Sequence, residues 1–127
     1  MDAPYVIEIE PEVRLWLMNL SDRDYAVVDH VAGRLADSPT TLGEPYSRHL
    51  GDGARELRFA LGHNRDAIRV SYWLAPDRRI VLLTIFRKTR SREDAEVARA
   101  QRAKSTCEAS HEPAHDEFTR AVEKGEL

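Results

Sequence analysis

The sequence has several informative absences. It holds a single cysteine, Cys107, so an internal disulfide is excluded. No apolar run approaches the ~20 residues that a membrane-crossing helix needs. The first residues carry early acidic side chains in place of the basic-then-apolar order of a secretory signal. These absences predict a cytoplasmic protein that keeps its thiol reduced and does not interact with membranes.

The charge is unevenly distributed along the chain. A net charge of −3 conceals a balance of −6 over residues 1–54, +7 over residues 55–104 and −4 over residues 105–127. An excess of one sign in the middle of a chain indicates a local surface for a polyanion. The alternative is that these arginines only keep the surface solvated.

Two helices are predicted in the first third of the chain. Residues 10–20 place apolar side chains at positions 13, 16, 17 and 20, which is the spacing of one helical face. Ser21 then suits an N-cap, with Asp24 three residues on. The second helix carries an apolar face through residues 27–35 and should end near Pro39.

Three strands and a third helix are predicted after a loop over residues 39–54. Residues 54–61, 67–75 and 79–88 have strand-like patterns with short connectors, which predicts an antiparallel meander. Residues 5–10 could add an edge strand. Ser91 suits the N-cap of a helix over residues 92–107 with a small apolar face that includes Ala95. The fold class is therefore α+β, with one domain over residues 1–107 and an acidic, flexible tail over residues 108–127.

Three segments carry a resemblance to a known family. Gly53–Phe59, with its Glu-Leu-Arg-Phe sequence, is similar to the second strand of the RelE/ParE superfamily of toxins. Ile68–Tyr72 resembles the third strand of that superfamily, and Ile80–Thr89 resembles the Phe-x-Lys strand end of its phage-derived, HigB-like branch. The order of the predicted elements is also that of the superfamily.

The resemblance implies the toxin of a type II toxin–antitoxin pair, an mRNA endoribonuclease that needs neither metal nor cofactor. The implied partners are a cognate antitoxin, expected to be a helix-turn-helix protein from the adjacent gene, and mRNA on the ribosome. Two alternatives share the fold: a ParE-like gyrase inhibitor, and an inactive member that binds its antitoxin and acts as a transcriptional co-repressor.

Such a ribonuclease activates the ribose 2′-OH, stabilises charge on the phosphate and protonates the leaving 5′-oxygen. Arg58 and Arg69 lie on the polar faces of adjacent strands, where two guanidinium groups could converge on one phosphate. Lys88 follows an apolar strand among several arginines and is the expected base. The full set of predicted catalytic residues is Arg58, Arg69, Lys88, Arg90 and His49; the predicted RNA-binding residues are Arg55, Arg87, Arg92, Trp73 and Tyr72, with Phe86 as a further stacking candidate.

Two further patterns bear on the chemistry. Cys107, His111 and His115 have the four-residue spacing of a helical zinc site, but Pro113 would break that helix, so no metal site is predicted. Many catalytic relatives carry a lysine just before the Glu-Leu-Arg strand, where this chain has Leu50–Gly53. The tyrosine or histidine that serves as their acid has no counterpart after Phe86, so the general acid is unassigned.

Overall fold

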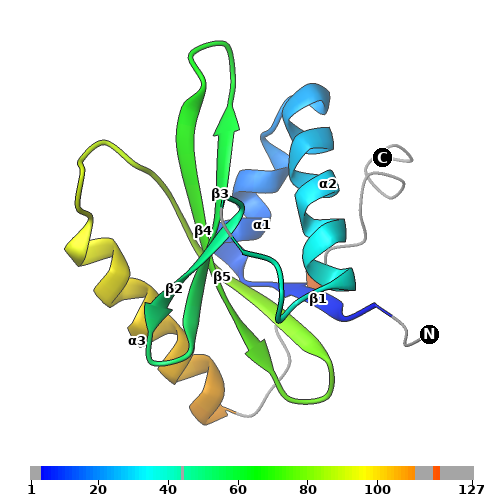
Figure 1. Cartoon of the computed structure of the whole chain (residues 1–127), viewed down its shortest axis with the longest axis vertical. Coiled ribbons are helices and arrows are strands. Elements are labelled where there is room, and N and C mark those ends of the chain that lie inside the picture. Colours follow the sequence, from blue (N-terminus) through cyan, green and yellow to red (C-terminus); the bar gives the residue numbers. More distant parts are fainter. Residues whose placement is uncertain (1–3, 44, 111–115, 118–127) are drawn as a thin grey trace.

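The computed structural model describes residues 4–43, 45–110 and 116–117. The chain forms three helices and a mixed sheet, with the helices on both faces of the sheet (Figure 1). The elements in chain order are β1 Val6–Ile9, α1 Pro11–Met18, α2 Asp22–Asp37, β2 Ser47–Gly51, β3 Ala54–Leu61, β4 Asp66–Ala75, β5 Arg79–Arg87, α3 Asp94–Ser110 and β6 Asp116–Glu117. The α+β class predicted from the sequence is confirmed.

The strands follow the order β2-β3-β4-β5-β1-β6. Strands β3, β4 and β5 form the predicted antiparallel meander. The expectation of a purely antiparallel sheet was wrong, because β1 runs parallel to β5, with Val6 opposite Arg79. The expectation that residues 39–54 form only a loop was also wrong, since residues 47–51 form β2 and pair with β3.

Helices α1 and α2 cover one face of the sheet and enclose the main core. Proline in the first turn suits the start of α1, because a first-turn N–H has no partner within the helix. The start of α2 is capped as predicted, with the Ser21 hydroxyl accepting from the Asp24 N–H at 3.1 Å. Both helices bury their apolar faces, and the deepest core side chains include Val13, Leu35, Leu57, Val70 and Ile80.

Helix α3 covers part of the opposite face through a thin apolar layer. Trp73, Ala75, Val81 and Leu83 lie on the sheet side, and Ala100 is the buried residue of the helix. The helix begins at Asp94, two residues later than Ser91 capping requires, and Ala95 of its predicted apolar face is exposed.

The boundary predicted after residue 107 falls inside α3, which continues to Ser110. Most of the predicted flexible tail, residues 111–115 and 118–127, lies outside the described residues. Within the described ranges, no helix is long and apolar enough to cross a membrane.

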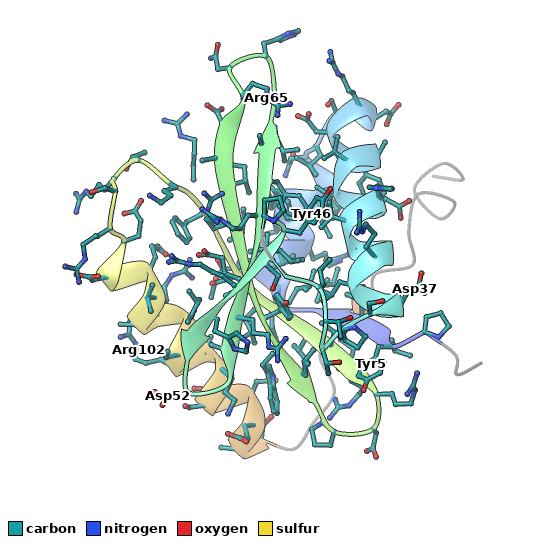
Figure 2. The ribbon with its side chains drawn as sticks, viewed as in Figure 1. Tyr5, Asp37, Tyr46, Asp52, Arg65 and Arg102 are labelled. Carbon is teal, nitrogen blue, oxygen red and sulfur yellow. The ribbon has the colours of Figure 1, made fainter. Side chains whose placement is uncertain are left out.

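Helix α3 lies beside the turn that joins β2 to β3. The Gln101 side chain donates to the Leu50 carbonyl at 2.8 Å, and the turn itself is marked by Asp52 near α3 in Figure 2. Asp52 and Gly53 both have positive φ, as a tight turn between strands requires. Arg65 marks the tip of the β3–β4 hairpin, at the far end of the sheet (Figure 2). The part of the sheet that α3 leaves uncovered lies beside the first turn of the helix.

Candidate active site

An open pocket lies between the sheet and the first turn of α3. Its volume is about 280 Å³. Since Leu57 and Val70 pack under α1 and α2, strand alternation directs Glu56, Arg58 and Arg69 to the α3 side. The side chains that line the pocket come from β2, β3, the end of β5 and the α3 N-terminus: Arg48, Glu56, Phe86, Lys88, Ser91, Arg92, Glu93, Asp94 and Val97.

A buried carboxylate forms the floor of this pocket. Glu56 is 4% exposed, and its Oε2 atom lies 2.9 Å from Arg48 Nε and 3.9 Å from Arg69 Nε. The three residues belong to three neighbouring strands, β2, β3 and β4. We call these residues, together with Arg58, the arginine–glutamate cluster.

Two arginines of the cluster face each other across strands. Arg58 and Arg69 occupy opposite positions of β3 and β4, so two like charges meet on one face. Arg58 Nε is buried without a hydrogen-bond partner among the described residues. Burial, and then the Arg58 charge, lower the pKa of Arg69, while Glu56 opposes this shift. Concentrated positive charge with an unsatisfied donor favours the binding of an anion.

Lys88 completes the positive rim of the pocket. Its ammonium donates to the carbonyls of Arg90 and Ser91, which orders the loop between β5 and α3. Arg90 is exposed in this loop, and the Arg92 side chain, which lines the pocket, is 82% exposed. Arg87 lies further out and pairs with Asp66 at 3.7 Å. The structure therefore brings most of the predicted cations to one end of the sheet.

Three predicted site residues lie on the other face of the sheet. His49 is opposite Arg55 in the sheet, and Arg55 is opposite Tyr72. Tyr72 belongs to the core beneath α1 and α2, so all three lie on the face away from the pocket. Arg55 instead donates to the Pro39 carbonyl at 3.2 Å.

The prediction that Tyr72 and Trp73 bind RNA was wrong. Tyr72 is 0% exposed, and its hydroxyl lies 2.5 Å from Ser47 Oγ. Trp73 is 8% exposed beneath α3, with Lys104 over its ring at 5.1 Å. Neither ring offers a face to a base, because α1 and α2 cover Tyr72 and α3 covers Trp73. The sequence pattern did not show that helices cover both faces of the sheet. Phe86, half-buried in the pocket wall, is the aromatic residue placed for stacking.

Arg48 and Glu56 were not identified as site residues from the sequence. Arg48 lay in a segment predicted to be a loop, and Glu56 was treated as an outward-facing residue of a strand. The pairing of β2 with β3, which places Arg48 directly opposite Glu56, is what brings them together. The alternation of Glu56 with Leu57 could have indicated the shared face with Arg58.

Of the three candidate zinc residues, Cys107 lies in α3, within the described part of the chain. Across residues 4–43, 45–110 and 116–117, no group of three or more metal-ligating side chains is arranged around a common point. His111 and His115 lie outside the described residues.

Comparison with known proteins supplies a family. The search of curated proteins found no match. The family model described as phage-derived protein Gp49-like (DUF891) matches residues 15–105, which include the end of α1, all of α2, the meander, the arginine–glutamate cluster and the first part of α3. The match covers well over half of the chain, and the protein therefore belongs to the Gp49-like family of phage-derived proteins.

Proposed function

We propose that this protein is the toxin of a type II toxin–antitoxin pair of the RelE/HigB type, and that it cuts mRNA. The observation that carries the proposal is the arginine–glutamate cluster, of which Arg48 and Glu56 line an open pocket. Two facing arginines and a buried, unsatisfied guanidinium nitrogen suit a phosphodiester. The adjacent Phe86 ring suits a base of single-stranded RNA.

The reaction would be attack of the ribose 2′-oxygen on the neighbouring phosphorus, with release of the 5′-oxygen. Arg48, Arg58 and Lys88 would place positive charge on the phosphate as its negative charge grows. Removing one such donor typically lowers a rate by ~10²–10³-fold. Arg69, which is 8% exposed and has its Nε atom 3.9 Å from Glu56 Oε2, is better placed to orient that carboxylate than to enclose a phosphate alone.

The proposal includes two partners. Translating ribosomes would present mRNA to the pocket in the cytoplasm, and an antitoxin from the adjacent gene would silence the protein. An antitoxin with acidic side chains over the pocket would neutralise the cluster directly. The phage-derived family of this chain agrees with a mobile toxin–antitoxin pair, although the family name states no activity.

The test is induction of the protein in bacteria, followed by mapping of RNA ends across the transcriptome. We expect growth arrest with cuts inside coding sequences, and relief when the adjacent gene is co-expressed. Arg58→Ala should abolish both effects. Arg23→Ala is the matched control, because it removes the same charge from an exposed position of α2 on the opposite side of the sheet.

Each other outcome would point to a different function. Intact transcripts with relaxed plasmid DNA would indicate a gyrase inhibitor. Normal growth at verified expression, with binding to the adjacent gene's product, would indicate an inactive co-repressor. Equal loss of toxicity in Arg58→Ala and Arg23→Ala would mean that total positive charge matters and that the cluster is no active site.

A further inference from the structure

We propose that Glu56 is the general base of this site and takes the proton of the ribose 2′-OH. The proposal rests on the ribonuclease function above and names the residue that starts the reaction. It replaces Lys88, the base that the sequence predicts. The argument depends on where the pocket places carboxylates, amines and imidazoles.

Glu56 presents a carboxylate to the pocket with one oxygen engaged. Both ion pairs, from Arg48 at 2.9 Å and Arg69 at 3.9 Å, go to Oε2. Among the described residues, neither a hydrogen bond nor an ion pair reaches Oε1. Since Glu56 lines the pocket while its two arginines hold it in place, Oε1 is a positioned acceptor beside the proposed phosphate site.

The other candidate bases are engaged or elsewhere. The Lys88 ammonium already donates to two backbone carbonyls, a role that requires its protons. His49 lies on the opposite face of the sheet, and Tyr72 is 0% exposed. Glu93 accepts from the Thr89 N–H at 2.9 Å, and the Asp94 side chain is 77% exposed beside Arg92. Among the carboxylates that line the pocket, Glu56 is the one that pairs with arginines of the arginine–glutamate cluster.

The reaction then balances as follows. The 2′-O–H bond breaks and its proton moves to the Glu56 carboxylate, while the 2′-oxygen bonds to phosphorus. The bond from phosphorus to the 5′-oxygen breaks, and that oxygen takes a proton from water. The products are a 2′,3′-cyclic phosphate and a 5′-hydroxyl, and Glu56 returns its proton to solvent.

Substrate binding would change the contacts of the Glu56 carboxylate. A phosphate that binds Arg48 would compete with Glu56 for the Nε donor that lies 2.9 Å from Oε2, so the carboxylate would lose its nearer arginine contact. The charged groups that face Glu56 come from every surrounding element: Arg48 of β2, Arg58 of β3, Arg69 of β4, Lys88 after β5, and Arg92, Glu93 and Asp94 at the start of α3.

The experiment measures mRNA cleavage in a purified translation system between pH 5 and pH 9. The variants are Glu56→Gln, which keeps the shape but cannot accept the proton, and Glu56→Asp, which keeps a carboxylate. Asp77→Asn is the control, because it removes a carboxylate from an exposed position of the turn between β4 and β5, outside the pocket. Circular dichroism and binding of an uncleavable 2′-deoxy substrate report on folding and on the phosphate site.

We expect Glu56→Gln to cleave ~10²–10⁴-fold more slowly than the wild type while still binding the 2′-deoxy substrate. The fall in wild-type rate toward acid should be absent from Glu56→Gln and retained in Glu56→Asp. Asp77→Asn should cleave within threefold of the wild type.

Three results would overturn the assignment. Cleavage by Glu56→Gln at the wild-type rate would overturn it, and so would an acid limb retained in the pH profile of that variant. If Glu56→Gln does not fold, a Glu56→Asp variant that folds and has lost the acid limb would refute the base. A wild type that cuts no RNA would instead refute the proposed function, and the inference with it.

Discussion

Replacing Arg69 with methionine should separate stability from activity. The Arg69 side chain is 10% exposed, and burial is the first cause that lowers its pKa. A cationic group whose pKa is lower in the folded chain than in the unfolded chain opposes folding wherever it is charged, and arginine is charged throughout the working range. Arg69→Met removes the cost of burying that charge and the repulsion from Arg58, and it keeps a long side chain.

The expected magnitude follows from what remains around Glu56. Arg48 stays 2.9 Å from the carboxylate, so the buried negative charge keeps its nearer partner. Replacing buried charges by apolar groups is often neutral or stabilising by ~1–4 kcal/mol. We therefore expect the free energy of unfolding of Arg69→Met to be no lower than the wild-type value, to within about 1 kcal/mol. RNA cleavage should fall ~10²-fold, because Glu56 loses a residue that orients it, and this loss corresponds to about 3 kcal/mol in the barrier.

Urea unfolding followed by the fluorescence of Trp16 and Trp73 measures the first quantity, and cleavage in translating extract measures the second. Arg48→Met is the contrasting variant, since it leaves Glu56 with the partner at 3.9 Å and should cost ~1–3 kcal/mol. A loss of more than about 3 kcal/mol in Arg69→Met would show that Arg69 is the indispensable partner of the carboxylate. Unchanged cleavage would refute its place in the site.

Three further predictions follow from contacts outside the pocket. Ser47→Ala removes the serine hydroxyl that lies 2.5 Å from the buried Tyr72 hydroxyl, and it should lower the free energy of unfolding in urea by ~1–3 kcal/mol. An unchanged value would mean that Arg55 or water replaces the serine. Arg99→Ala removes the contacts of α3 to Glu12 at 2.6 Å and to the Ile85 carbonyl at 3.2 Å, so it should speed amide hydrogen exchange in α3 more than in α2. An equal change in both helices would mean that Arg99 does not hold α3 in place. Burial raises the pKa of the Cys107 thiol, so at pH 8 alkylation should be slower in the folded protein than in urea, and equal rates would contradict this burial.

Local patterns were sufficient to predict the helices and the meander. The apolar spacing and caps of α1 and α2, and the alternation in β3 and β4, are properties of neighbouring residues, and the structure confirms them. Strand β2 was missed because its Ser-Arg-His-Leu-Gly sequence has the composition of a loop. Its strand conformation depends on pairing with β3, which no local pattern shows.

The site was only partly predictable for the same reason. Strand alternation placed Arg58 and Arg69 on one face, and that placement agrees with the structure. Glu56 acquires its surroundings from Arg48 on one side and Arg69 on the other, and both contacts cross between strands. Tyr72 and Trp73 were assigned to RNA because the sequence does not say which strand faces a helix covers.

The parallel pairing of β1 with β5 joins strands that are synthesised at very different times. β1 pairs with a strand that begins 73 residues later, as the opposition of Val6 and Arg79 shows. At synthesis rates of ~5–20 residues per second, β1 waits roughly 4–15 seconds for that neighbour. Helices α1 and α2 can form in this interval, but the sheet that they cover cannot close. The apolar side chains of β1 therefore leave the ribosome long before β5 is available for pairing. They stay unburied by the sheet until β5 has been synthesised.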